Sequence, residues 1–275
     1  YRLNCFRLVN VSRLQNHGQA WKTQALGDPT LIIARVGLRL MLRLACPIFL
    51  SLCAIPAHAI ECRQALALGL DVSGSVDARE YRLQMDGLAQ ALAAPSVQSA
   101  LLAQPQFPVR LLVYEWSGPT DLRLIAPWTT IKTKDDLSSV VQTLHTTQRA
   151  ASGPGTALGH AMLAGATYLE QTSCWSKTLD ISGDGTSNLG PRPRDVKSLL
   201  EGRQITINAL AIGPVEAITD DIKKVPASDL AAYFRAEVIM GPDAFVETSV
   251  GFSQYTAAMT RKLEREIKML QLSMR

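Results

Sequence analysis

Short apolar runs that alternate with segments of helical periodicity constrain the fold of this chain most strongly. The run at 65–70 reads ALALGL, and comparable strands are predicted at Thr178–Ser182 and Ile205–Ile212. Continuous apolar runs of this length are typical of strands buried on both faces of a parallel sheet. Between the first two strands, apolar residues recur at helical spacing, beginning with Tyr81, Met85, Leu88 and Leu92. This alternation predicts an α/β fold with a doubly wound, mostly parallel central sheet and helices on both faces.

The remaining elements complete this pattern. Val109–Trp116 and Leu122–Trp128 flank a turn-forming SGPT segment and predict one antiparallel hairpin at an edge of the sheet. A short last strand is predicted at Glu237–Met240. Further helices are predicted at Asp135–Leu144, from Thr156 to about Glu170, at Pro191–Gly202 and at Asp229–Phe234. A final helix carries one apolar stripe, which we interpret as core packing and which comprises Phe252, Tyr255, Met259, Leu263 and Ile267.

The segment 41–59 has the organisation of a secretory signal peptide. Arg43 follows Met41, an apolar core covers Leu44–Ile55, and Ala57-His58-Ala59 is a small-x-small cleavage site. We expect cleavage after Ala59 and a periplasmic or secreted protein. The apolar run is too short to span a bilayer comfortably, and we expect no stable membrane span in the mature form. The alternative is a buried N-terminal helix.

This interpretation divides the chain of 275 residues into three parts. Residues 1–40 are interpreted as an upstream extension of the reading frame, 41–59 as the signal peptide, and 60–270 as a single domain. Residues 1–59 carry seven basic side chains and one acidic one, so residues 60–275 carry 21 basic against 23 acidic side chains. The folded part therefore offers no bulk electrostatic case for binding nucleic acid.

Two cysteines remain after cleavage, Cys62 and Cys174. They lie nine residues before Asp71 and ten residues before Asp184, and both aspartates follow strands that we expect to be neighbours. The cysteines should then lie together at the opposite ends of those strands, within the distance that a disulfide needs. A single pair in an exported chain favours a disulfide, and the alternative is two inert buried thiols.

Three separated segments place oxygen-bearing side chains at the carboxyl ends of predicted strands or at the start of a helix. DVSGS occupies 71–75, Thr156 follows a loop, and Asp184 follows another strand. Ligands of open α/β sheets gather at this edge. Three hydroxyls and two carboxylates suit a hard cation such as Mg²⁺. Each residue alone could be a cap or a turn residue, but their joint placement favours a site.

These residues resemble the von Willebrand factor A-type (vWA) domains. DVSGS is similar to their Asp-x-Ser-x-Ser signature, while Thr156 in GPGTALGHA and Asp184 in ISGDG are similar to the threonine and aspartate of their other two motifs. The resemblance covers most of 62–268. More narrowly, the signal peptide and phrases such as GPDAFV at 241–246 resemble an exported bacterial family of unknown function, and that likeness supplies no activity.

The resemblance implies a metal-ion-dependent adhesion site. Ser73, Ser75 and Thr156 would bind Mg²⁺, or Mn²⁺ or Ca²⁺, directly, and Asp71 and Asp184 would hold its waters. The ion would keep one position that an exposed Asp or Glu of an unidentified protein partner completes. Metal and partner should then reinforce each other's binding.

Two other functions compete with this binding module. SGDGTSN at 182–188 is similar to a loop of lipid and nicotinamide-nucleotide kinases, but here it comes late in the chain, and Ser182 replaces a glycine. A phosphatase would want a second aspartate where Ser73 stands. We therefore expect no catalytic residues and no enzyme. The third alternative is an ion that only stabilises the fold.

Several neighbouring residues receive other interpretations. Asp180 alternates with Ser182 and Asp184 along its strand and is interpreted as a hydrogen-bonded buried carboxylate. His145 and His160 have no partner at metal or triad spacing. Loops at 213–220 and 241–248 are expected to share the rim of the metal site and to set its specificity.

Overall fold

The computed structural model describes residues 62–214 and 225–273 of the chain. The predicted signal peptide at 41–59, the upstream extension at 1–40 and the cleavage site at Ala59 lie outside these residues. Within the described ranges, no helix has both the length and the apolar character needed to cross a membrane.

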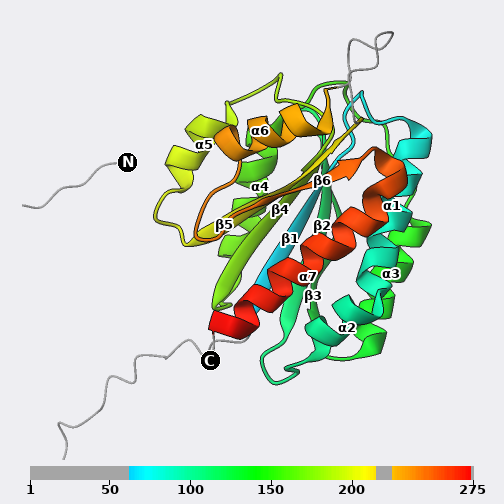
Figure 1. Cartoon of the computed structure of the whole chain (residues 1–275), viewed down its shortest axis with the longest axis vertical. Helices are drawn as coiled ribbons and strands as arrows, with labels where there is room; N and C mark the ends of the chain where they lie inside the picture. Colours follow the sequence, from blue (N-terminus) through cyan, green and yellow to red (C-terminus); the bar gives the residue numbers. More distant parts are fainter. Residues whose placement is uncertain (1–61, 215–224, 274–275) are drawn as a thin grey trace, which may run out of the picture. The chain divides into compact units, whose positions relative to one another are not determined.

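A six-stranded sheet forms the centre of the described structure (Figure 1). Its spatial order is β3-β2-β1-β4-β5-β6, and every neighbouring pair is parallel except β2 and β3. The strands are β1 (Gln64–Asp71), β2 (Val109–Trp116), β3 (Leu122–Ile131), β4 (Ser176–Gly183), β5 (Ile205–Gly213) and β6 (Val246–Val250). The predicted α/β fold with one antiparallel edge hairpin is confirmed.

Helices cover both faces of this sheet (Figure 1). One face carries α1 (Ala78–Ala93), α2 (Pro95–Leu102), α3 (Lys134–Thr146) and α7 (Tyr255–Ser273). The other face carries α4 (Leu158–Glu170), α5 (Pro193–Leu200) and α6 (Ala227–Glu237). Chain order changes direction at β1, because β2 lies on one side of it and β4 on the other. Such a reversal leaves a crevice at the carboxyl ends of the central strands.

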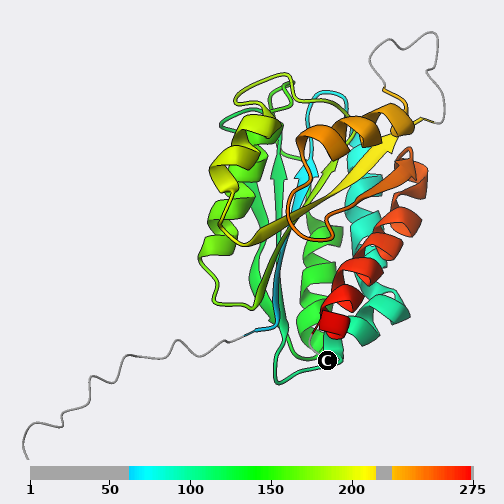
Figure 2. The same ribbon diagram turned by 60° about the vertical axis from the view of Figure 1, so that its left-hand side comes forward.

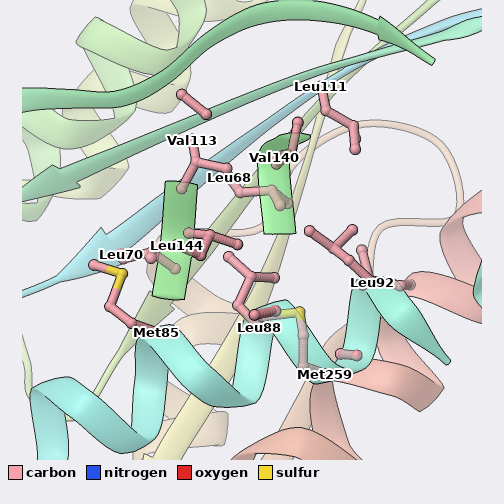
Figure 3. Packing of buried hydrophobic residues seen from close by; sticks show 14 of the residues in the cluster. Leu68, Leu70, Met85, Leu88, Leu92, Leu111, Val113, Val140, Leu144 and Met259 are labelled. Carbon is pink, nitrogen blue, oxygen red and sulfur yellow. The ribbon is translucent and has the colours of Figure 1, made fainter. Parts of the chain in front are cut away.

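The alternation of side chains along β1 explains why two cores form. Leu66, Leu68 and Leu70 point to the α1 and α7 face, while Ala65 and Ala67 belong to the core on the opposite face. In the first core the side chains of α1 and α7 meet those of the strands, as Figure 3 shows for Leu88 and Met259 among others. The predicted apolar stripe of the final helix is buried in this core from Phe252 to Ile267.

The start of α1 follows from its sequence. Asp77 caps the helix by accepting a hydrogen bond from the Glu80 N–H at 2.8 Å, and the Glu80 carboxylate accepts one from the Asp77 N–H at 3.0 Å. This reciprocal capping box satisfies two backbone donors that the helix itself cannot pair. It fixes the point at which the chain leaves the DVSGS segment.

The predicted disulfide between Cys62 and Cys174 is present in the structure. The two Cα atoms are 4.6 Å apart, and the Trp175 N–H donates to the Cys62 carbonyl at 3.1 Å. Cys62 lies two residues before the start of β1, and Cys174 lies two residues before the start of β4. The bridge therefore joins these neighbouring strands at their amino ends, opposite to the end that carries Asp71 and Asp184.

The last strand was predicted at Glu237–Met240, and this prediction is wrong. Glu237 ends α6, and Met240 makes only an isolated antiparallel bridge with Ile207. The chain then turns at Gly241 and Asp243, which both have positive φ angles, before β6 pairs with β5 from Val246 onward. β6 is a short edge strand with mixed burial, so its residues lack the apolar pattern that marks the inner strands.

Candidate metal centre

The loops after β1 and β4 lie together at the carboxyl end of the sheet. In Figure 2 the strand β1 points toward the end where these loops gather. The two strands pair in parallel register, with Leu70 opposite Ser182, so Asp71 and Asp184 leave the sheet at neighbouring positions. A third loop joins them, because the Gly74 N–H donates to the Pro154 carbonyl at 3.2 Å. All three predicted motifs are thereby placed at one edge.

Hydrogen bonds connect four of the five predicted site residues. The Asp71 Oδ1 atom accepts from the Ser73 N–H at 2.8 Å. The hydroxyls of Ser73 and Ser75 are 3.2 Å apart, and the Ser75 hydroxyl donates to Asp184 Oδ1 at 2.5 Å. DVSGS thus forms a tight turn in which the Ser73 hydroxyl lies beside that of Ser75, and Ser75 reaches Asp184.

Thr156 reaches the same place from the other side. Together with Ser75 and Asp184 it lines a cavity of about 390 Å³, whose further lining residues include Asn188 and Val225. Asp71 and Ser73 lie behind this cavity and are almost completely buried. The structure therefore brings all five predicted residues into one neighbourhood, with three of them on the cavity wall.

The backbone of Thr156 is held by Asn188, which the sequence analysis did not select as a site residue. The Thr156 N–H donates to Asn188 Oδ1 at 2.8 Å, and the Asn188 N–H donates to the Thr156 carbonyl at 3.0 Å. Helix α4 begins two residues after Thr156. The sequence signal for this role is the SGDGTSN segment itself, because Asn188 closes it and it continues from the end of the strand that carries Asp184 to the site.

The hairpin turn between β2 and β3 supports the same loop. The Asp121 Oδ2 atom accepts from the Gly153 N–H at 3.0 Å and from the Ser117 hydroxyl at 3.2 Å. The Ser117 carbonyl accepts from the Ala157 N–H at 2.7 Å. These contacts join segments that are distant in sequence, so no local pattern could have indicated them.

Arg149 fixes the DVSGS turn from outside. Its guanidinium donates to the carbonyls of Val72 and Val76, and the Ser152 hydroxyl also donates to the Val72 carbonyl at 3.1 Å. The charged group lies over the Tyr81 ring, 5.8 Å from its centroid. The turn is held by donors to its backbone, so its side chains remain directed toward Asp184.

Burial raises the pKa of the Asp71 carboxyl well above its usual range, and the nearby charge of Asp184 raises it further. The Oδ2 atom of Asp71 is buried and has no hydrogen-bond partner within the described residues. Two carboxylates close together in a buried place disfavour their own ionisation. A cation bound between them and the hydroxyls would offset this repulsion.

The donor set restricts the kind of metal that could bind. Within residues 62–214 and 225–273, no three His, Cys, Asp or Glu side chains gather into a group that could hold an ion. The candidate site instead combines two carboxylates with hydroxyls. Such oxygen donors suit a hard cation, and they lack the nitrogen and sulfur ligands typical of a structural zinc site.

Asp180 has the structural role that its position in the strand indicated. It is buried and forms an ion pair with Lys262 of α7, with 2.9 Å between Oδ1 and Nζ. Lys262 also contacts Glu266 at 2.6 Å, and the Asn208 amide donates to the same Glu266 oxygen at 2.8 Å. This buried network ties β4 and β5 to α7.

The two histidines lie outside the candidate site. His145 pairs with Asp86 on the surface, with 2.9 Å between Nδ1 and Oδ1. His160 lies in the first turns of α4, and its ring is close to the Gly190 backbone.

One of the two predicted rim loops is misplaced. Gly241 and Pro242 line a cavity with Trp175 at the amino ends of β4 and β5, away from the metal edge. The reason is that β6 runs parallel to β5, so the loop before β6 enters the sheet at its opposite end. Gly213 and Pro214, from the other predicted loop, do lie beside Asp184. Residues 215–220 of that loop lie outside the described residues.

Comparison with known sequences yields one family. The family model described as a protein of unknown function, DUF1194, matches residues 61–271. No curated protein matches the sequence.

Comparison with solved structures shows a vWA-like fold. Proximal thread matrix protein 1 from the mussel byssus, in a form described with a zinc-occupied MIDAS motif, is 16% identical with a TM-score of 0.51, over 76% of this chain and 48% of that protein. The pilus adhesin SpaC from Lactobacillus rhamnosus GG is 13% identical with a TM-score of 0.55, over 76% of this chain and 30% of the adhesin. The D319A mutant of the PilB minor pilin from Streptococcus sanguinis is 11% identical with a TM-score of 0.53, over 79% of this chain and 64% of the pilin. The chain therefore spans only part of each of these proteins, and at such identities the likeness concerns the fold alone.

Proposed function

This chain belongs to the DUF1194 family of proteins of unknown function, and we propose that it is a metal-dependent protein-binding module acting outside the cytoplasm. In this proposal a divalent cation bound at the carboxyl edge of the sheet captures an acidic side chain of a partner protein. The observation that carries the proposal is the shared cavity of Ser75, Thr156 and Asp184, with Asp71 and Ser73 directly behind it.

The residues divide into two roles. The hydroxyls of Ser73, Ser75 and Thr156 would bind the cation directly, and the carboxylates of Asp71 and Asp184 would hold its water molecules. A cation held this way retains much of its positive charge and supplies an open position for a carboxylate. Mg²⁺ fits this oxygen set, and Mn²⁺ or Ca²⁺ is an alternative ion.

The rigidity of the loops supports a role in recognition. Asn188 holds the Thr156 backbone, Ser117 holds that of the adjacent Ala157, and Arg149 holds the DVSGS turn. A site whose geometry is fixed before the ligand arrives loses less conformational entropy on binding. Asn188 belongs to the SGDGTSN segment, so this contact gives that segment a supporting role that needs no nucleotide.

The similar structures are consistent with this proposal. The mussel protein is described with zinc in its adhesion motif, and SpaC is described as a pilus adhesin. The disulfide between Cys62 and Cys174 supports a location outside the cytoplasm, because disulfides persist in oxidising compartments. The signal-peptide pattern before Ile60 is consistent with the same location, either periplasmic or secreted.

Selection from a library of random displayed peptides in Mg²⁺, with elution by a chelator, tests this function. We expect the selected peptides to contain Asp or Glu, and we expect binding to be lost when that residue is replaced by its amide. Isothermal titration of Mg²⁺ alone, with and without a selected peptide, should show that each ligand tightens the binding of the other. Peptides that bind equally well in chelator, or with the amide in place of the acid, would overturn the proposal.

A further inference from the structure

A second cavity adjoins the candidate metal site. It has a volume of about 190 Å³ and lies between the end of β5, the start of α1 and the segment that leads from β6 into α7. Asp184 lines this cavity as well as the larger one that holds Ser75 and Thr156. The two cavities therefore share one lining residue.

The walls of the second cavity are largely apolar. Five of its lining residues are apolar or carry no side chain: Ile212, Gly213, Pro214, Gly251 and Phe252. A cavity of about 150 Å³ with walls of this kind can hold a benzene molecule. The space beside Asp184 therefore has room for one apolar side chain of about the size of leucine.

Two glycines line this cavity, and each position disfavours a side chain for a different reason. A Cβ atom at Gly213 would lie 2.5 Å from the Val225 carbonyl oxygen, so the packing of the chain before α6 excludes a side chain there. At Gly251 a Cβ atom would meet nothing within 4 Å, but the φ angle of +64° disfavours any other residue. The wall of the cavity is therefore bare backbone at these two positions.

The carboxylate of Glu80 makes the cavity selective against acidic side chains. Glu80 lines it from α1, and its carboxylate is held in place by the Asp77 N–H of the capping box. A second acidic side chain of a ligand would therefore be repelled from this cavity, whereas an apolar one would not. The metal cavity and this cavity consequently favour opposite kinds of side chain.

We infer that the second cavity is a specificity subsite, so that the partner segment combines an acidic residue for the cation with a neighbouring leucine-sized apolar residue. This inference rests on the proposed function and specifies its ligand. Burial of one leucine side chain should tighten binding by about ten- to a hundredfold. The carboxylate would supply the dependence on metal, and the apolar residue would supply the choice among acidic segments.

A set of designed peptides provides the test. Each fluorescein-labelled heptapeptide has a central Asp among Gly and Ser residues, and Leu is placed at each other position in turn. Fluorescence anisotropy with the full chain in Mg²⁺, and again in chelator, gives the affinities. We expect Leu at one position, or at two neighbouring ones, to tighten Mg²⁺-dependent binding about tenfold or more. Glu at the same position should bind more weakly than Gly.

Two variants locate the effect in the cavity. Phe252→Ala should remove the advantage of the Leu peptide and favour a larger Trp at that position, while Phe107→Ala, a matched aromatic truncation of an exposed residue, should change neither. Glu80→Gln keeps an acceptor for the helix cap, so it should fold even if Phe252→Ala does not. It should relieve the rejection of the Glu-bearing peptide several-fold.

The possible results separate the two proposals. Mg²⁺-dependent binding of the Asp peptides with no position at which Leu improves the affinity would overturn the subsite and leave the proposed function standing. The subsite would also be overturned, with the proposed function left standing, if the Leu advantage persists unchanged in Phe252→Ala and the Glu penalty persists unchanged in Glu80→Gln. Failure of every acidic peptide to bind in Mg²⁺ would overturn the proposed function, and the subsite with it.

Discussion

Ser75 and Asp184 are 109 residues apart in the sequence, yet the Ser75 hydroxyl donates a hydrogen bond of 2.5 Å to the Asp184 carboxylate. The parallel pairing of β1 and β4 makes this contact possible, because it brings the ends of two distant strands to the same height. The same relationship shows that the two motifs form one polar unit. Variants of its members should therefore act on binding more than on folding.

Thr156→Ala should abolish Mg²⁺-dependent binding of acidic peptides, because it deletes one candidate ligand of the cation. The melting temperature should change little, because the Thr156 side chain fills no position in the apolar core. Loss of a ligand or of its anchor commonly costs about 10–100-fold in metal affinity. Thr167→Ala replaces an exposed threonine of α4, the helix that begins two residues after Thr156; it is the matched control and should behave as wild type. If Thr156→Ala still binds in a chelator-sensitive way, the site assignment is wrong. A large drop in its melting temperature would instead favour a purely structural ion.

Asn188→Ala should weaken Mg²⁺ binding about tenfold, since it removes the acceptor that orients the Thr156 backbone. Asn188 is exposed, so its truncation should change the free energy of unfolding only slightly. Asn188→Asp retains the acceptor oxygen and should recover most of the affinity. Isothermal titration with Mg²⁺ measures both variants, and equal affinities for wild type and Asn188→Ala would show that Asn188 does not position Thr156.

Reduction of the disulfide between Cys62 and Cys174 should destabilise the protein. The bridge closes a loop with a sequence separation of 112, for which the chain-entropy model gives about 4–5 kcal/mol, with less expected in practice. Urea unfolding should shift to lower midpoints in reductant for the wild type, and the double variant Cys62→Ser, Cys174→Ser should not respond to reductant. Titration of two free thiols in denatured, unreduced exported protein would contradict the bridge.

Lys262→Met should destabilise the fold by about 3–5 kcal/mol, because it leaves the buried carboxylates of Asp180 and Glu266 without their cation. Arg261→Met, which breaks an exposed ion pair on the same helix, should cost at most about 1 kcal/mol. Urea unfolding at neutral pH measures both. If both variants lose the same free energy of unfolding, burial does not increase the contribution of the Lys262 ion pairs to stability.

The stability of Lys262→Met should also depend on pH in a defined direction. Burial raises the pKa of Asp180 above its usual range even beside Lys262, which lowers it. In the unfolded chain the same carboxyl group has a pKa of about 4. Between that value and the raised one, the folded variant binds more protons than the unfolded chain, so its free energy of unfolding should rise as the pH falls toward about 5. A loss of stability over that range would contradict this account.

The sequence was most informative where a pattern is local. The buried strand β1, the helical spacing from Tyr81 to Leu92 and the α7 stripe were all predicted, because each depends on the spacing of nearby residues. The site residues could be grouped because their motifs lie at strand ends, which a parallel sheet brings to one edge. Asn188 and Asp121 were missed because their roles arise only when separate loops meet. The short edge strand β6 was missed because it is only partly buried and lacks an apolar pattern, and this error also misplaced the loop at 241–248.

The disulfide and the candidate metal site lie at opposite ends of the same strand, and this arrangement has a mechanical consequence. A pull between a ligand on the metal edge and the chain at Cys62 would act along the length of β1. The hydrogen bonds of β1 to β2 and to β4 run across that direction, so they would bear the load together in shear and would not open one after another. The bridge to Cys174 would pass part of the tension directly into β4. The centre of the sheet is therefore arranged to resist extension along the axis on which a captured partner would pull.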